Sequence, residues 1–175
     1  MPRTTTDEVS LLIAGVGIPW AGDLDLGPLV ARRCRERVLP AGVHVEEVTV
    51  AAHRVVHLLQ ELAPDALLIV ACHPRGDEPG TIRWRAPQRD GPDPAELQAR
   101  LGESVSGVID LDHILAITAY YGALPEDTCV LEVEPIDTGF AAEPSADALA
   151  LVPDLLARID AEVARLTAPS PPHRS

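Results

Sequence analysis

The 175-residue chain contains no lysine, so all 14 of its basic residues are arginine, and they face 27 acidic residues. The formal net charge of −13 repels phosphate backbones and anionic lipid surfaces, which argues against a nucleic-acid partner and against membrane binding. The sequence also lacks the apolar run of about 18 residues that a membrane-spanning helix needs. Residues 1–8 lack the hydrophobic core of a secretion signal.

Cysteine and aromatic residues are scarce. Three cysteines are present, Cys34, Cys72 and Cys129, and their odd number and wide spacing do not form a disulfide framework. Free thiols persist in a reducing compartment, so we expect a cytoplasmic protein. Aromatic residues make up only 3% of the chain, and we therefore expect an aliphatic core.

The common catalytic and nucleotide-binding motifs are also missing. The sequence contains no G-x-S-x-G, no H-E-x-x-H and no paired C-x-x-C, and a chain without lysine has no Walker motif. The glycine-rich loop from Gly15 to Gly22 has Trp20 where a dinucleotide fingerprint needs its third glycine. Asp23 and Asp25 would repel a phosphate at the start of the next helix. Binding of a nucleotide or another small molecule is therefore the least supported of the functions considered.

Apolar runs alternate with helical patterns along the chain, as is typical of a doubly wound α/β domain. The run at 66–71 is apolar at every position and predicts a central parallel strand, while the imperfect alternation at 43–50 predicts a strand near a sheet edge. Further strands are predicted at 9–16, 81–85 and 128–133, and helices at 26–37, 53–62, 93–101, 110–122 and 145–166, the last with a kink at Pro153.

We therefore predict one domain over residues 9–167, with a mostly parallel central sheet flanked by helices in the manner of phosphorylase/hydrolase-like folds. Residues 1–8 and 168–175 are expected to be flexible termini. The sequence does not specify an oligomeric state.

Open parallel sheets bind ligands beyond the carboxyl ends of their strands. The loops expected there carry Asp23, Asp25, Cys72 and His73, and His113 lies close by in the sequence. Cysteine, histidine and aspartate are metal ligands, but each of these residues also has a structural interpretation. Asp25 can cap the helix that follows, Cys72 can be a buried thiol, and His113 can be a half-exposed residue on a helix.

The order of several motifs resembles the hydrogenase maturation proteases, endopeptidases that remove the C-terminal tail of the nickel–iron hydrogenase large subunit. The first loop of that family has glycines and an acid at the places of Gly15, Gly17, Asp23 and Gly27. The segments that match its later motifs are 65–72, Pro79-Gly80-Thr81, 122–126 and 133–135. The resemblance extends over roughly residues 9–166. It implies that the chain recognises or cleaves a hydrogenase large-subunit precursor.

The resemblance places Leu24, Ala71 and Gly107 where that family carries the acid, aspartate and histidine that bind nickel. None of these three residues can ligate a metal. Either the site is built instead from Asp23, Asp25, Cys72, His73 and His113, or the chain is a metal-free adaptor or chaperone that binds a precursor without cutting it. We expect no cofactor, with nickel from the precursor taking part only if the family chemistry survives. We also expect Leu24, Ala71 and Gly107 to converge at the strand ends.

Overall fold

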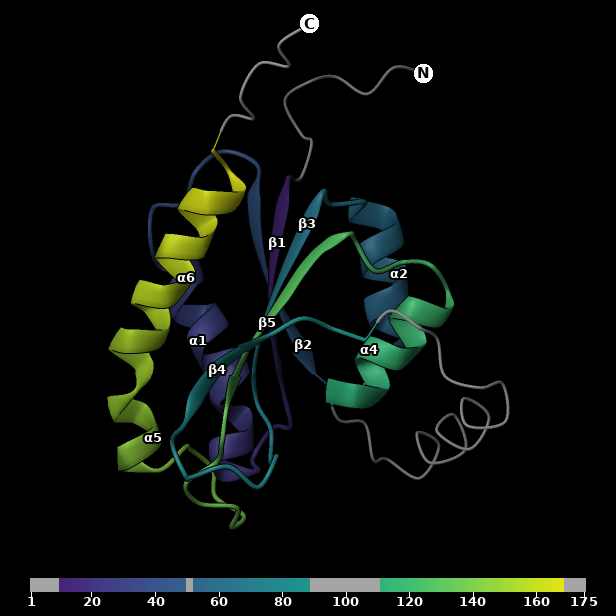
Figure 1. Cartoon of the computed structure of the whole chain (residues 1–175). Coiled ribbons are helices and arrows are strands. Elements are labelled where there is room, and N and C mark those ends of the chain that lie inside the picture. The colour runs from purple at the N-terminus through teal and green to yellow at the C-terminus, as the bar shows by residue number, and fades with distance from the viewer. Residues whose placement is uncertain (1–9, 50–51, 89–110, 169–175) are drawn as a thin grey trace, which may run out of the picture.

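Five strands form one sheet in the part of the chain that the computed structural model describes, residues 10–49, 52–88 and 111–168 (Figure 1). The strands are β1 (Leu11–Gly17), β2 (Val43–Thr49), β3 (Ala66–Cys72), β4 (Ile82–Arg85) and β5 (Asp127–Val133), and their order is β2-β1-β3-β5-β4. The pairs β1–β2, β1–β3 and β3–β5 are parallel, whereas β4 runs antiparallel to β5. The predicted α/β class and the predicted edge position of β2 are both confirmed.

The central strand is β3, as its sequence predicts. All seven of its residues are buried. A strand with a parallel neighbour on each side and helices over both faces cannot expose a side chain to water, which explains its unbroken apolar run.

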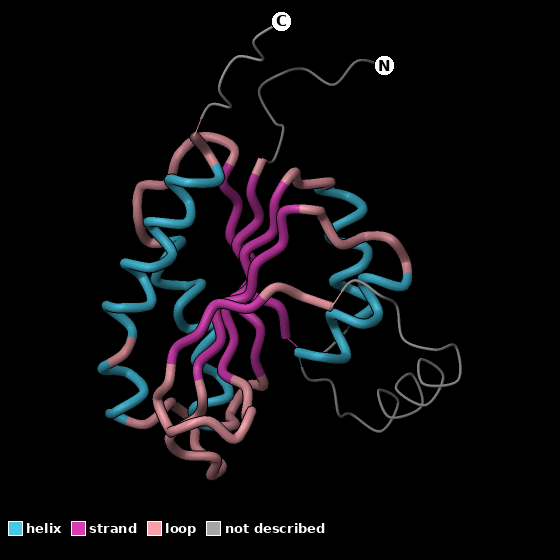
Figure 2. Tube along the Cα trace, viewed as in Figure 1, coloured by secondary structure: helices cyan, strands magenta, loops and turns pink. Residues whose placement is uncertain are grey.

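Helices cover both faces of the sheet, as Figure 2 shows. They are α1 (Leu26–Arg35), α2 (Ala52–Leu62), α4 (Leu111–Tyr120), α5 (Ala146–Ala150) and α6 (Val152–Leu166), and a short 3-10 helix, η1 (Gly22–Asp25), precedes α1. Figure 1 shows α1, α5 and α6 on one face and α2 and α4 on the other. None of the helices in the described ranges is long and apolar enough to cross a membrane.

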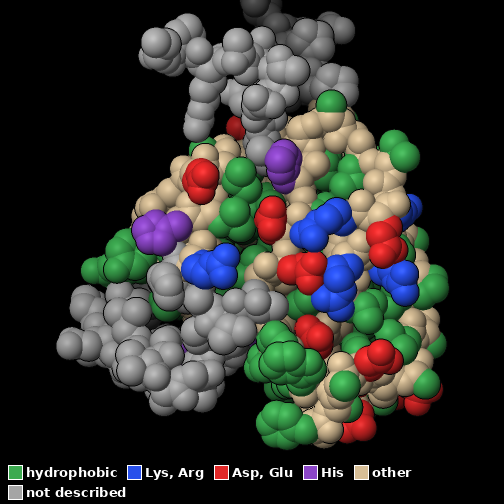
Figure 3. Space-filling model, turned by 180° about the vertical axis from the view of Figure 1, so that it is seen from behind, with side chains coloured by type: hydrophobic (Ala, Val, Ile, Leu, Met, Phe, Trp, Pro, Cys, Tyr) green, Lys and Arg blue, Asp and Glu red, His purple; other side chains and the backbone are tan. Residues whose placement is uncertain are grey.

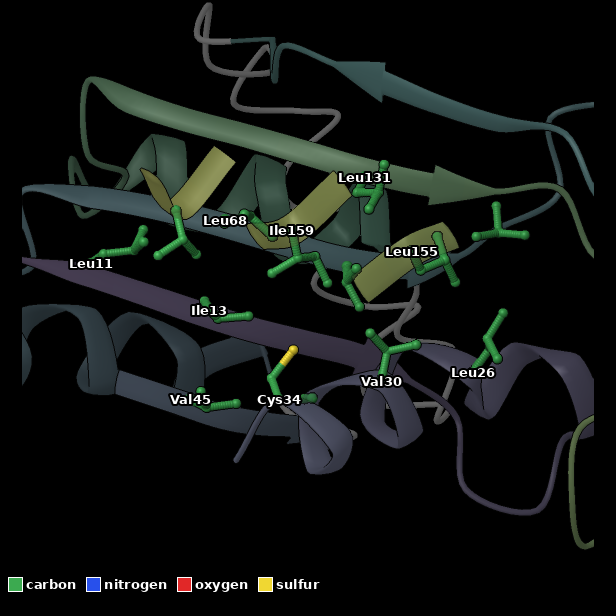
Figure 4. Packing of buried hydrophobic residues seen from close by; sticks show 14 of the residues in the cluster. Leu11, Ile13, Leu26, Val30, Cys34, Val45, Leu68, Leu131, Leu155 and Ile159 are labelled. Carbon is green, nitrogen blue, oxygen red and sulfur yellow. The ribbon is translucent and has the colours of Figure 1, made fainter. Parts of the chain in front are cut away.

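The core has two halves, one on each face of the sheet. Leu68 and Val70 of β3 pack in the half that includes α1 and α6, and Figure 4 shows this half with Leu68, Leu131 and Ile159 labelled. Leu67 and Ile69 point to the opposite face and pack in the half that includes α2 and α4. Alternation along each strand therefore divides the aliphatic side chains between the two halves.

The predicted helix at 145–166 divides into two helices. Its first part, α5, starts where the hydroxyl of Ser145 accepts a hydrogen bond from the backbone amide of Ala148. Pro153 lies in the first turn of α6, where a residue without an amide hydrogen costs nothing. The predicted kink is thus a break at Leu151. The predicted helix at 93–101 lies outside the described residues, as do residues 1–9 and 169–175.

Helix α1 approaches the sheet closely, and three glycines allow it. A Cβ atom added to Gly27 would lie 2.5 Å from the carbonyl oxygen of Val70 and would also collide with the carbonyl oxygen of Val16. A Cβ on Gly15 would lie 2.6 Å from the Cβ of Ala31, and one on Gly17 would lie 2.5 Å from the carbonyl oxygen of Leu24. These glycines let the loop after β1 turn back tightly, which places Leu24 beside the strand ends.

We predict that Gly27→Ala lowers the free energy of unfolding by about 3 kcal/mol, because two backbone oxygens on different strands must move. Gly122→Ala is the matched control. Gly122 has φ +62° and no neighbour within 4 Å of an added Cβ, so it should cost only about 1 kcal/mol of left-handed strain. Urea unfolding of both variants measures the difference. Equal costs for the two variants would contradict the packing account.

Candidate functional site

A pocket of about 140 Å³ lies at the carboxyl ends of β1 and β3. The chain crosses from β1 to β2 on one side of β1, while β3 lies on its other side, so the strand order reverses between β1 and β3. Such a reversal is where open α/β sheets bind their ligands. The residues that line the pocket come from the ends of both strands, the loop after β1 and the start of α4: Val16, Gly17, Ile18, Leu24, Ala71, Cys72, His73, Pro74, Leu111 and Ile114.

Leu24 and Ala71 lie in the wall of this pocket, so the structure brings together two of the three positions expected to converge. Gly107, the third, lies outside the described residues. Ile18 also lines the pocket, and the aliphatic side chains of Leu111 and Ile114 lie in the wall formed by α4. Aliphatic groups have no lone pair to offer a cation. The side chains at Leu24 and Ala71 therefore do not fit a nickel ion.

The residues proposed for a relocated metal site do not gather in the pocket. Cys72 and His73 line it, but Asp23, Asp25 and His113 do not. Within the described ranges, no group of three or more histidine, cysteine, aspartate or glutamate residues is arranged to hold a metal ion.

The thiol of Cys72 is held in its protonated form. Cys72 belongs to the half of the core that includes α1 and α6, together with Val70 and Leu131. Burial, together with the negative charges of Asp23 and Glu134, raises the pKa of the Cys72 thiol to about 12. A thiolate is the form that attacks carbonyls and binds metals, so Cys72 is a poor nucleophile and a poor ligand.

Asp23 is fully buried and acts as an acceptor for the segment that follows β5. Its Oδ2 accepts hydrogen bonds from the backbone amides of Ile136 (3.0 Å) and Asp137 (2.7 Å). The amide of Ser145 donates to Oδ1 at 2.7 Å, and the hydroxyl of Ser145 donates to Oδ2 at 3.2 Å. Burial alone would raise the pKa of Asp23, but these hydrogen bonds outweigh it and leave the pKa below its usual value. Asp23 therefore fastens the loop after β1 to the loop after β5.

Two structural interpretations from the sequence are wrong. Asp25 precedes α1, but its carboxylate makes no capping hydrogen bond, because η1 already leads the backbone into the helix. Burial, with a contribution from Glu47 against that of Arg32, raises the pKa of Asp25. His113 is not half-exposed: only 6% of its surface is accessible, on a helix that packs against α2.

A network of charged side chains lies beside the pocket, where β3, β4, β5 and α4 meet. The guanidinium of Arg75 donates to both carboxylate oxygens of Asp112, at 2.6 and 2.7 Å, and to both oxygens of Glu132, at 3.1 and 2.8 Å. Arg85 reaches the same Glu132 at 2.5 Å. Glu134 accepts hydrogen bonds from the backbone amides of Arg75 and Gly76.

His73 connects this network to the pocket. Its Nε2 lies 3.5 Å from Oδ2 of Asp112, and its ring is only 12% exposed. The hydrogen bond from His73, followed by those from Arg75, holds the pKa of Asp112 well below its usual value. Asp112 therefore stays ionised and orients His73 at the pocket wall.

Sequence reasoning missed Arg75, Glu132 and Glu134. The signal that could have found them is Glu132 itself, an acid between the apolar residues Leu131 and Val133 of β5 and only 4% exposed. A buried carboxylate needs a paired cation, and the loop after β3 supplies Arg75.

No protein-family model matches the chain, and no curated protein matches it. Solved structures do resemble it. The [NiFe] hydrogenase maturation protease HycI from Thermococcus kodakarensis KOD1 shares 24% identity over 90% of this chain and 93% of its own, with a TM-score of 0.67. The hydrogenase maturating endopeptidase HybD from E. coli covers the same shares at 17% identity and a TM-score of 0.69.

A hydrogenase 2 maturation peptidase from a Thaumarchaeota archaeon is similar at 16% identity, over 88% of this chain and 97% of its own, with a TM-score of 0.61. At such identities the likeness shows a common fold. The chain therefore has the fold of the hydrogenase maturation proteases, which confirms the fold that the sequence resemblance implies.

We predict that Asp23→Asn lowers the free energy of unfolding at pH 7 by about 3 kcal/mol, because an amide nitrogen would face backbone donors. Asp25→Asn is the control and should be neutral or slightly stabilising, since the folded state raises the pKa of Asp25.

Because the folded state lowers the pKa of Asp23, the contribution of Asp23 to the free energy of unfolding is present above about pH 4, the unfolded value. That contribution is lost as the pH falls through the folded value. Urea unfolding between pH 2 and 7 checks both. A variant as stable as wild type would contradict the role of Asp23.

Proposed function

We propose that this protein is a maturation endopeptidase that acts on a nickel–iron hydrogenase large-subunit precursor. The observation that carries the proposal is the shared fold over about nine-tenths of the chain with proteins described as hydrogenase maturation proteases. The pocket at the reversal of strand order supports it, because it lies where this class of sheet places its ligands. The three free thiols, Cys34, Cys72 and Cys129, support a cytoplasmic location, where thiols stay reduced.

Among the described residues that line the pocket, His73 is the one whose side chain suits proton transfer. Imidazole is the commonest general base in enzymes, and Asp112 orients this one, with Arg75 holding Asp112 in turn. In the proposed reaction His73 accepts a proton from the water that adds to the scissile carbonyl. It then donates that proton to the leaving amine, which gives a new carboxyl terminus and a free tail peptide. The apolar wall around Leu24 and Ala71 excludes other water from the reacting bond.

The second candidate function is binding of the precursor without cleavage. The observation that favours it is the pair of aliphatic residues, Leu24 and Ala71, at positions that correspond by sequence resemblance to metal ligands. A nickel ion held by the precursor would contact the aliphatic side chains of Leu24 and Ala71 and would gain no ligand from them. A protein of this kind would serve as an adaptor or chaperone for the precursor. For both candidates we propose that the chain carries no metal of its own.

The test is incubation of the full chain with a purified large-subunit precursor, nickel-loaded in one arm and nickel-free in the other. We expect mass spectrometry to show removal of the C-terminal tail. His73→Gln should lower the rate by at least about 100-fold while the precursor still binds, because a general base contributes that much. His57→Gln, an exposed histidine on α2, is the control and should keep the wild-type rate.

Stable co-elution with an intact tail would replace the endopeptidase with the adaptor. Neither cleavage nor co-elution would contradict both candidates.

A further inference from the structure

Two aromatic side chains are exposed close to the pocket end of the sheet. Trp20 is 74% exposed and Phe140 is 97% exposed. Ile18, which lines the pocket, is itself 42% exposed and so links the pocket to the surface around it. Large apolar side chains on a surface cost solubility, and a group of them beside a pocket marks a site of interaction.

The backbone holds Trp20 in an unfavourable conformation. Its φ is +60°, a region that bulky residues rarely adopt. The turn that imposes it is closed by the amide of Ala21, which donates to the carbonyl of Ile18 at 3.2 Å. Such strain persists only where the surrounding structure enforces it, and it concentrates at functional sites.

The loops that carry Trp20 and Phe140 are joined to one another. The amide of Gly22 donates to the carbonyl of Ala141 at 3.0 Å, two residues from Trp20 and one from Phe140. Asp23 binds both ends of the segment around Phe140, at Ile136 and at Ser145. These hydrogen bonds therefore hold the two loops that carry Trp20 and Phe140 in a fixed position relative to each other.

The two segments that carry Trp20 and Phe140 have only negatively charged side chains. Neither residues 10–31 nor residues 134–157 contain an arginine or a histidine. Exposed acids lie in the second segment at Asp137, Glu143 and Asp147. Figure 3 shows hydrophobic and acidic side chains gathered at the lower end of the molecule, with the arginines above them. A partner that docks here needs apolar and basic groups together.

We propose that Trp20, Phe140 and the pocket form a docking surface for a peptide segment of the precursor that carries one leucine-sized aliphatic side chain flanked by basic residues. The proposal rests on the proposed function for the identity of the partner. The aliphatic side chain enters the pocket between Leu24 and Ala71, and the basic residues face Asp137, Glu143 and Asp147. An apolar cavity of about 150 Å³ holds a benzene-sized group, and this pocket of about 140 Å³ holds one branched side chain.

The aliphatic wall then determines which side chain of the partner can enter the pocket. Where a metal-binding wall would select for nickel, Leu24 and Ala71 select for hydrocarbon. A polar or charged side chain entering the pocket would lose its hydration without gaining a partner, and this loss excludes it.

The test measures the dissociation constant of the purified precursor for the full chain and its variants by biolayer interferometry. Trp20→Ala and Phe140→Ala should each weaken binding about tenfold, as truncation of an aromatic anchor does. Val38→Ala is the control, since Val38 is also an exposed apolar residue but follows α1, which leads away from the pocket, and it should leave binding within about twofold. Glu143→Arg should weaken binding, whereas Asp65→Arg, an exposed acid just before β3, should leave it unchanged.

A second arm uses synthetic glycine–serine peptides that carry one leucine between two arginines, with nuclear magnetic resonance of the full chain. The chain has two tryptophans, so the indole signal of Trp20 should shift while that of Trp84, on β4, stays in place. Peptides with serine for leucine, or with glutamate for arginine, should leave both signals unmoved.

The two arms separate the two proposals. If the precursor binds and the Trp20, Phe140 and Val38 variants all bind as wild type does, the docking surface is overturned and the proposed function stands. If the wild-type chain fails to bind the precursor, the peptide titration tests the docking surface by itself. A selective shift of Trp20 then keeps the docking surface while the proposed function falls, and no shift overturns both.

Discussion

The buried carboxylate of Asp23 is the interaction on which the site depends most. It joins the loop after β1 to the loop after β5, two segments more than a hundred residues apart in sequence, through backbone amides at Ile136, Asp137 and Ser145. An ionised acid in that position is stable because amide hydrogens surround it. Leu24 comes next in the chain, so the same contact fixes one wall of the pocket. Trp20 and Phe140 lie on the two loops that Asp23 holds together.

The glycines where α1 packs against β1 and β3 supply the second constraint. Gly27 brings the start of α1 against the carbonyl oxygens of Val16 and Val70, closer than any side chain would allow. This approach keeps the loop short and directs it over the ends of β1 and β3. Asp23 then needs only to fix the position of a loop whose path the glycines already restrict. On the other side of the pocket, Arg75 performs a similar role by joining α4 to β5 through Asp112 and Glu132.

The strands were predictable because their signals are local. The apolar run of β3 and the turn residues around it identify a central strand without any knowledge of its neighbours. The burial of His113 and the lack of a cap at Asp25 were not predictable, because each depends on what packs nearby. The pairs formed by Arg75 are 37 and 57 residues apart in sequence, and no local pattern indicates them. The positions of Leu24 and Ala71 came from motif resemblance and sheet geometry together, and the structure places both in one pocket.

The aliphatic character of that pocket is the central claim, and titration with nickel tests it most directly. Wild-type protein should give no heat of binding and no thermal stabilisation, since Leu24 and Ala71 offer no donor atoms. The double variant Leu24→Glu/Ala71→Asp should bind nickel with roughly micromolar affinity, because two carboxylates and His73 would then line one pocket. Leu149→Glu/Ala150→Asp, the same change at exposed positions of α5, should bind none. Micromolar binding by wild type, or no binding by the folded pocket variant, would contradict the account.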